Sequence, residues 1–297
     1  MCLIAFALGG TGPCPLLLAS NRDEWWQRPT QPLDRWHSPV GTPIWAGRDA
    51  EAGGTWLGFS AHGRVAMLTN VRPRGPESAP RSRGELPLHW LDGPGHTPHW
   101  RDLVARTHPA AYNGFNLVLG DLHTATWVWL SNRPTAEAPQ SSDLGLPTGW
   151  TGRSLGPGVY GLSNAHLDTP WPKTLALRAA VRAAHARLRT GPAPDGWHAP
   201  LLRQLLDARP APDATADAWQ RGLSSTFVHL PAHGYGTRSS LIARCSLGAD
   251  GPALELQEWT HAVQSAPHAV PVASHWPLDA SVQRRISINR WGMPTSS

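Results

Sequence analysis

The first twenty-four residues constrain this chain more than any other stretch does. Cys2 follows the initiator Met and opens the apolar run 3–8, which is typical of a short buried strand. A second apolar run, residues 16–20, comes after the Gly- and Pro-containing stretch 9–13, whose composition favours a turn. We therefore predict a hairpin that brings Asn21, Arg22 and Asp23 back towards Cys2.

The position of Cys2 in the chain also makes its thiol a candidate nucleophile. Its small side chain allows an aminopeptidase to remove Met1, and the thiol and a free α-amine then belong to one residue. Such an amine has a pKa of about 8, so part of it is unprotonated at neutral pH and can accept the thiol proton. The sequence thus predicts an N-terminal nucleophile. The alternatives are a cysteine that serves as a small buried hydrophobe, and a polar turn at 21–24.

Composition excludes several classes of protein. The chain has 297 residues and 40% hydrophobic content, enough to bury a substantial core. Its formal charge is +5, yet only 16% of residues are charged and the arginines are spread out, which argues against a nucleic-acid-binding protein. Three cysteines and fifteen histidines show no metal-type spacing, so we expect no metal site. The cysteine usage suits a reducing compartment, so we expect a cytoplasmic location.

The pattern of the apolar N-terminus does not indicate a secretory signal peptide. No Lys or Arg precedes it, and Gly, Thr and Pro residues interrupt it. The sequence also lacks a run of about eighteen apolar residues, so we expect no transmembrane helix.

Hydrophobic periodicity predicts hairpins and a few helices in the rest of the chain. The expected hairpins cover 55–60 with 64–70, 115–120 with 124–130, and 239–245 with 253–259, with further strands at 159–163 and 226–229. The expected helices cover 84–91, 100–106, 169–190 and 200–209, the third with Thr169 as its cap and a solvated face that includes Lys173 and Arg178. We expect loops at 27–49, 71–83 and 133–155.

This order of elements predicts an α+β fold. Runs of antiparallel hairpins are separated by helical stretches and do not alternate as βαβ units. We expect one domain over residues 1–261. Residues 262–297 are rich in Pro, Ser and His, which predicts a weakly ordered tail or a strap over the surface.

Short motifs over nearly the whole chain resemble those of one known family. They are Asn21-Arg22-Asp23-Glu24, Ala46-Gly47-Arg48-Asp49, Gly53-Gly54-Thr55-Trp56, Leu68-Thr69-Asn70, Arg83-Gly84-Glu85-Leu86, Gly161-Leu162-Ser163-Asn164, Asp168-Thr169-Pro170-Trp171-Pro172-Lys173 and Tyr235-Gly236-Thr237-Arg238. This set resembles the NRDE family, also called the transport and Golgi organisation protein 2 family. The resemblance implies the fold of the N-terminal nucleophile (Ntn) hydrolases, a four-layer αββα sandwich of two antiparallel sheets whose first strand opens at the nucleophile.

Thiolate attack on an amide carbonyl needs a base, a cation that favours the thiolate and donors for the oxyanion. Cys2 would supply the nucleophile and the base, and Arg22 would favour the thiolate. Either Asp23 or Glu24 would orient the amine. The side-chain amide of Asn164 suits an oxyanion donor, and a second cation is available further along the chain, at Arg238. These roles resemble those in the Cys-type members of the fold that cleave bile-salt and penicillin amides.

Further residues of the motifs are predicted to contact the substrate: Asn21, Glu24, Trp25, Asn70 and Arg83. The alternative for Asn21 and Arg22 is to tie a turn, and for Asn164 to anchor a loop.

Two functional classes remain open at this point. One is an amidohydrolase that acts on a small amide or acyl compound and requires no cofactor. The other is a carrier without catalysis, because the resemblance implies a role in intracellular haem movement or in the handling of lipid or acyl-CoA; haem is then a ligand. A scaffold for secretory traffic is the weakest class.

Overall fold

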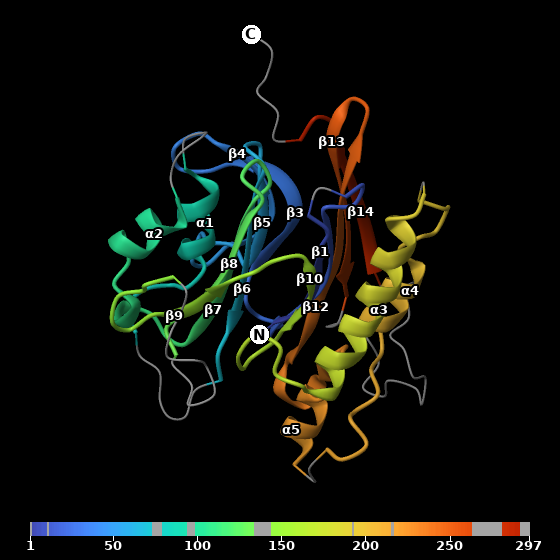
Figure 1. Cartoon of the computed structure of the whole chain (residues 1–297). Helices are drawn as coiled ribbons and strands as arrows, with labels where there is room; N and C mark the ends of the chain where they lie inside the picture. The colour runs from blue at the N-terminus through green and yellow to red at the C-terminus, as the bar shows by residue number, and fades with distance from the viewer. Residues whose placement is uncertain are drawn as a thin grey trace. The chain divides into compact units, whose positions relative to one another are not determined.

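The computed structural model describes residues 2–10, 12–72, 79–93, 99–133, 144–191, 193–214, 217–262 and 281–291. The chain divides into two compact units, and the single domain over residues 1–261 stays a prediction. The first comprises residues 1–28, 157–163 and 168–289, and the second comprises residues 29–156, 164–167 and 290–297. Each unit contains one antiparallel sheet with its own helices (Figure 1).

The sheet of the first unit is built around the predicted N-terminal hairpin. Its strands, in spatial order, are β10 (Gly158–Leu162), β1 (Cys2–Leu8), β2 (Leu16–Trp25), β12 (Tyr235–Gly248), β13 (Gly251–His261) and β14 (Ser281–Ile288), and the short β11 (His229–Leu230) also pairs with β12. All of these pairs are antiparallel.

Strand register places the residues of the N-terminal motif opposite specific partners. Cys2 lies opposite Arg22, and Arg22 lies opposite Ser239 on β12. Asp23 lies opposite Thr237, and the register shifts between Thr237 and Ser239. Because side chains alternate along a strand, Cys2 and Arg22 lie on one face of the sheet and Asp23 lies on the other.

Three helices belong to the first unit: α3 (Pro172–Leu188), α4 (Ala199–Leu205) and α5 (Ala218–Leu223). Helices α3 and α4 pack against β1, β2 and β12, and Figure 1 shows them along one side of this sheet. Their apolar side chains join Leu3, Leu17 and Ile242 in one buried core. The long helix begins two residues later than predicted, since Trp171 is its N-cap and Pro172, not Pro170, is its first helical residue.

The second unit has a sheet of seven consecutive strands. They are β3 (Thr30–His37), β4 (Pro43–Asp49), β5 (Leu57–Ser60), β6 (Arg64–Asn70), β7 (Phe115–Asp121), β8 (Thr126–Ser131) and β9 (Thr151–Ser154). The predicted helices are present as α1 (Glu85–Leu91) and α2 (Trp100–Arg106). They contribute apolar side chains to a core shared with β6, β7 and β8.

Several strands occur where the sequence predicted loops or a tail. The pair β3–β4 lies within 27–49, β9 lies within 133–155, and β14 lies within the predicted tail. Strands β3, β9 and β14 are at sheet edges, and β3 buries only Leu33 fully. An edge strand needs few apolar residues and tolerates Pro, so its pattern is weak in the sequence. The rest of the tail, most of residues 133–143 and part of the loop 71–83 lie outside the described residues.

The antiparallel α+β class is therefore confirmed, with helices packed on a sheet in each unit. The stacking of four layers stays a prediction. Among the described residues, no helix combines the length and the apolar character that crossing a membrane requires.

Two glycine motifs meet in the second unit, at Gly54 and Gly84. A Cβ atom on Gly54 would lie 2.5 Å from the backbone carbonyl carbon of Gly84, and Thr55 N donates to Gly84 O at 3.0 Å. We expect Gly54→Ala to lower the free energy of unfolding by about 1–3 kcal/mol, because backbone atoms must move apart. Urea unfolding measures this effect. Gly156→Ala is the control, since open space surrounds that position; an equal loss there would contradict the steric explanation.

Candidate functional site

Cys2 begins strand β1 and is 6% exposed. Ser163 Oγ donates to the Cys2 carbonyl oxygen at 3.2 Å, which fixes the start of the strand. Burial raises the pKa of the Cys2 thiol, and the charge of Asp23 adds to the rise while Arg22 opposes it. Arg22 thus acts in the predicted direction, but its effect on the pKa is smaller than that of burial.

Arg22 lies directly opposite Cys2 in the sheet and is 4% exposed. Its Nη2 atom is 3.6 Å from Glu24 Oε2, two residues along the same face of β2. The structure therefore places Arg22 opposite Cys2 in the sheet and Glu24 beside Arg22, and the role of Arg22 towards the thiol stays a prediction. Glu24 interacts with Arg22 here, whereas the role of orienting the amine is untested for Glu24 and for Asp23.

Asp23 is 1% exposed and lies on the face of the sheet that α3 covers. It accepts a hydrogen bond from Thr237 Oγ1 at 2.7 Å, and the same hydroxyl accepts one from Val228 N at 2.8 Å. Burial raises the pKa of Asp23, and the positive charge of Lys173 and the Thr237 hydrogen bond oppose the rise. A buried carboxylate with these partners is held in one position.

Lys173 was predicted on a solvated helix face, and this prediction was wrong. The side chain is 6% exposed, and its Nζ atom donates to Leu223 O at 2.7 Å. Lys173 precedes Leu177 and Val181 by four and eight residues, so it belongs to the buried stripe of α3. The spacing by itself predicts a buried position for Lys173. A lysine is usually exposed to solvent, however, so its charge led to the opposite prediction.

Arg238 occupies the register shift in β12 next to Arg22. Its Nη1 atom donates to the carbonyl oxygens of Trp25, Trp26 and Arg28 at 3.1, 2.9 and 3.2 Å. Burial lowers the pKa of Arg238, and the charge of Arg22 adds to this effect. Arg22 is therefore close enough to Arg238 to affect its pKa, and Arg238 also holds the end of β2.

Asn21 is completely buried, and its side chain forms hydrogen bonds with two backbone carbonyl groups and one hydroxyl group. Its Nδ2 atom donates to Leu205 O at 2.8 Å and Thr226 O at 2.9 Å, while Ser240 Oγ donates to its Oδ1 at 2.6 Å. Ser240 also contacts His261 Nε2 at 2.9 Å. These contacts connect β2 to the end of α4, to the segment after α5 and to β12. The predicted substrate contact of Asn21 stays a prediction.

Trp25 is 43% exposed and lies in an aromatic cluster at the end of β2. Its ring centroid is 5.9 Å from that of Trp219 and 5.1 Å from that of Tyr235. An exposed aromatic edge of this kind suits contact with a ligand.

Three predicted residues belong to the second unit. Asn164 Nδ2 donates to Asn70 O at 2.9 Å, and Arg72 N donates to Asn164 O at 2.9 Å. Arg83 Nη1 donates to Gly114 O at 3.0 Å. The oxyanion role of Asn164 and the substrate contacts of Asn70 and Arg83 stay predictions.

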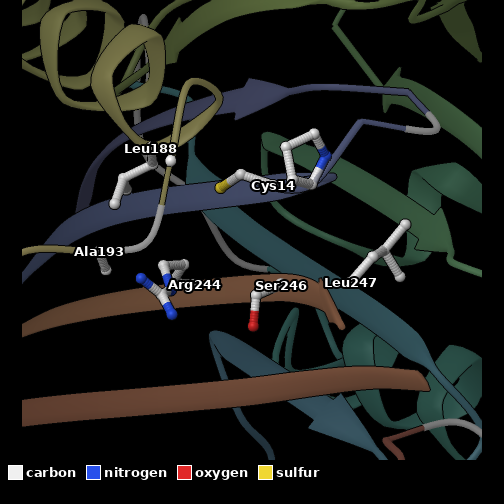
Figure 2. Close-up of a pocket in the computed structure, with 8 residues that line it drawn as sticks. Cys14, Leu188, Ala193, Arg244, Ser246 and Leu247 are labelled. Carbon is white, nitrogen blue, oxygen red and sulfur yellow. The ribbon is translucent and has the colours of Figure 1, made fainter. Parts of the chain in front are cut away.

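A cavity of about 230 Å³ lies beside Cys14, near the turn of the β1–β2 hairpin. Figure 2 shows the Cys14 thiol and the Arg244 guanidinium among its lining side chains. Cys2 and this turn are at opposite ends of the seven-residue strand β1, about 20 Å apart at the rise of a strand. Burial raises the pKa of Cys14 to about 11, so this thiol is poorly suited to nucleophilic attack. The cavity is therefore separate from the Cys2 site.

The first unit thus gathers a thiol, two arginines, a buried carboxylate and a buried lysine around the ends of β1 and β2. Sequence reasoning missed three residues of this site, although all of them lie inside the family-like motifs: Ser163, Lys173 and Thr237. Among the described residues no group of His, Cys, Asp and Glu side chains could hold a metal ion.

Two solved structures are similar to the chain at a TM-score of 0.46. One is the *Caenorhabditis elegans* N-acylethanolamine-hydrolyzing acid amidase ortholog, at 12% identity, covering 81% of this chain and 91% of that one. The other is a conjugated bile acid hydrolase from *Clostridium perfringens*, at 9% identity, covering 97% of both chains.

Curated sequences give a closer match. The transport and Golgi organization protein 2 homolog of *Bos taurus* is 34% identical over 242 residues, which cover 76% of this chain and 80% of the relative. The human homolog is 33% identical with the same coverage. The mouse homolog is 38% identical, but the match spans 53% of each chain. The family model described as Transport and Golgi organisation 2 matches residues 1–248, and the chain belongs to that family.

Proposed function

We propose that the chain is an amidohydrolase whose nucleophile is Cys2, exposed as the N-terminal residue by removal of Met1. The observation that carries the proposal is the register of β1 and β2, which sets the thiol opposite Arg22 and next to the strand position of Asp23. Nucleophile, cation and carboxylate are groups that thiol-based acyl transfer uses.

In the proposed reaction the free amine of Cys2 accepts the thiol proton. The sulfur then forms a bond to the carbonyl carbon of the amide, and the carbon–nitrogen bond breaks as the leaving amine takes that proton. Water hydrolyses the resulting thioester and releases the acid. Asp23 is the group proposed to orient the Cys2 amine, because Thr237 donates to its carboxylate and the positive charge of Lys173 favours the ionised form.

Loss of Met1 is a necessary part of this mechanism. While Met1 is present, the nitrogen of Cys2 is a peptide nitrogen that cannot act as a base. Burial then raises the pKa of the thiol and disfavours the thiolate. Intact-mass measurement on protein from its native host is expected to show a chain that begins at Cys2.

We expect Cys2→Ala to reduce amine release from a panel of N-acyl amides to background, whereas Cys14→Ala retains activity. The reason is that only the first change removes the sulfur that forms the thioester. The measurement is the rate of amine release by each purified variant, with circular dichroism to verify folding.

Two results would contradict the proposal that the chain is an amidohydrolase. One is turnover that persists in folded Cys2→Ala protein. The other is an absence of turnover on every amide together with iodoacetamide labelling of Cys2 no faster than that of Cys14 and Cys245, whose thiol pKa values burial raises to about 11 and about 12.

A carrier without catalysis is the second candidate, and the burial of Cys2 favours it. A buried thiol with a raised pKa suits a structural residue better than a nucleophile. The exposed Trp25 cluster would then be the contact for a haem or an acyl-CoA-like ligand. Stoichiometric haem binding in a Soret titration, unchanged by Cys2→Ala and without any amide turnover, would favour this candidate.

A further inference from the structure

The cavity of about 230 Å³ beside Cys14 is lined by residues of the first unit and has no part in the proposed reaction. Its apolar lining comes from Pro13, Leu188, Ala193 and Leu247. Leu247 is 39% exposed, so the cavity lies at the surface. A cavity of about 150 Å³ is large enough for benzene, so this one has room for a ring that carries a small polar group.

The polar lining of this cavity carries one sign of charge. Among the described residues that line it, Arg244 is the only charged one, beside the Ser246 hydroxyl and the Cys14 thiol. Arg244 and Ser246 are two residues apart on β12, so their side chains lie on the same face of the sheet, and Figure 2 shows both on this strand. A ligand in the cavity therefore meets a positive charge and no lining carboxylate.

The contacts of Arg244 leave part of its guanidinium group for a ligand. Its Nε atom is buried and lies 3.1 Å from Glu255 Oε2, and its guanidinium carbon lies 5.2 Å from the ring centroid of Trp197. Within the part of the chain that the structure describes, the two Nη atoms have no hydrogen-bond partner and, unlike Nε, they are not buried. These two atoms carry four N–H donors in a planar fork. Glu255 thus contacts the Nε side, and the Nη fork is the part that a ligand can reach.

A second cation lies near the cavity. Burial raises the pKa of the Cys14 thiol, and the positive charges of Arg244 and Arg189 both oppose the rise. Both arginines are therefore close to a thiol that lines the cavity, although Arg189 itself is exposed outside the lining. The partly exposed Glu255 offsets some of this charge. The balance suits a ligand with one negative charge better than a doubly charged phosphate.

We propose that this cavity binds a small organic carboxylate, whose two oxygens accept hydrogen bonds from the Nη atoms of Arg244 and whose apolar body lies against Leu188, Ala193 and Leu247. The planar fork of a guanidinium matches the two oxygens of a carboxylate, and hydrogen bonds between charged groups are about twice as strong as those between neutral groups. A cation of the same shape would meet a like charge. A neutral molecule would form only the weaker bonds.

The test compares three probes of similar shape: benzoate, nitrobenzene and benzamidine. They are an anion, a neutral molecule and a cation, and none of them contains an amide that the proposed reaction could cleave. Each is titrated calorimetrically at millimolar concentration into the full chain. We expect saturable binding of benzoate, binding of nitrobenzene that is weaker by about tenfold or more, and no binding of benzamidine.

Two arginine variants locate the bound benzoate. Arg244→Gln is expected to weaken benzoate binding by about tenfold or more, because it removes the charge that the carboxylate pairs with. Arg203→Gln removes the same charge from an exposed position on α4 outside the cavity lining, and is expected to have no effect. Benzoate that was bound near Cys2, through Arg22 or Arg238, would bind equally well to both variants.

A pair of substitutions at Ser246 gives a second test that leaves Arg244 in place. Ser246 lines the cavity and is partly buried. Ser246→Asp is expected to abolish benzoate binding, because its carboxylate occupies the Nη fork of Arg244, whereas Ser246→Asn has the same size without the charge and retains binding. Circular dichroism verifies the fold of each variant. Equal affinities for benzoate and nitrobenzene, no benzoate binding at millimolar concentration, or unchanged benzoate affinity in Arg244→Gln or in Ser246→Asp would each overturn the proposal.

Discussion

Lys173→Met is expected to lower the free energy of unfolding by about 3–5 kcal/mol at neutral pH, because it leaves the Asp23 carboxylate buried without its cation. The substitution keeps the length and apolar stem of the side chain, so the packing beside Leu177 is retained. It removes the charge that opposes the rise in the pKa of Asp23, and it removes the hydrogen bond to Leu223 O. Urea unfolding followed by circular dichroism measures the loss.

The pH dependence of this loss identifies its cause. Burial raises the folded-state pKa of Asp23, so the folded protein accepts a proton there more readily than the unfolded chain does. The corresponding contribution to stability is present at low pH and is lost as the pH rises through the folded-state pKa. In Lys173→Met this pKa is higher still. The difference between variant and parent is therefore expected to shrink as the pH falls and Asp23 becomes neutral in both.

Arg182→Met is the control, since Arg182 is exposed on the same helix. It removes the same unit of charge and is expected to change the free energy of unfolding by less than about 0.5 kcal/mol. If Lys173→Met were no more destabilising than Arg182→Met, or if its effect did not depend on pH, Lys173 would not be the counter-ion of Asp23.

The case of Lys173 shows why part of the site could not be predicted from the sequence. The hairpin from Cys2 to Asp23 was predictable because two apolar runs flank a turn, and strand pairing then fixes Cys2 opposite Arg22. Lys173 contacts Leu223 fifty residues further along the chain. No local pattern encodes such a contact, and a Lys on a helix is usually solvated.

The same reasoning applies to the fold. Strands with alternating or continuous apolar residues, such as β1 and β7, were predicted within a residue or two. Strand β14 carries Arg284 and Arg285 among partly exposed residues at a sheet edge, so its sequence has no buried face to reveal it. It is a strand because β13 offers it backbone partners from Leu254 to His261.

Asn21→Ala is expected to lower the free energy of unfolding by about 3–5 kcal/mol, because it leaves several buried polar groups without partners. The carbonyl oxygens of Leu205 and Thr226 lose their shared donor, and Ser240 loses its acceptor. Each buried group that loses its hydrogen bond costs about 1–3 kcal/mol. The measurement belongs at pH 8. Burial lowers the pKa of His261, the other partner of Ser240, to about 3, and this His destabilises the fold progressively as the pH falls below its ordinary value near 6.5.

A double-mutant cycle with Ser240→Ala separates the network from the simple loss of one side chain. If Asn21 and Ser240 act as one buried unit, the double variant is more stable than the sum of the two single losses predicts, because the second substitution removes a group that the first has already orphaned. The expected coupling is about 1 kcal/mol or more. Additive losses would show that the two side chains are independent. A fully stable Asn21→Ala protein whose KM for an amide substrate rises would instead give the first residue of the motif the substrate contact that the sequence predicts, and the hydrogen bonds to Leu205 and Thr226 would then be dispensable.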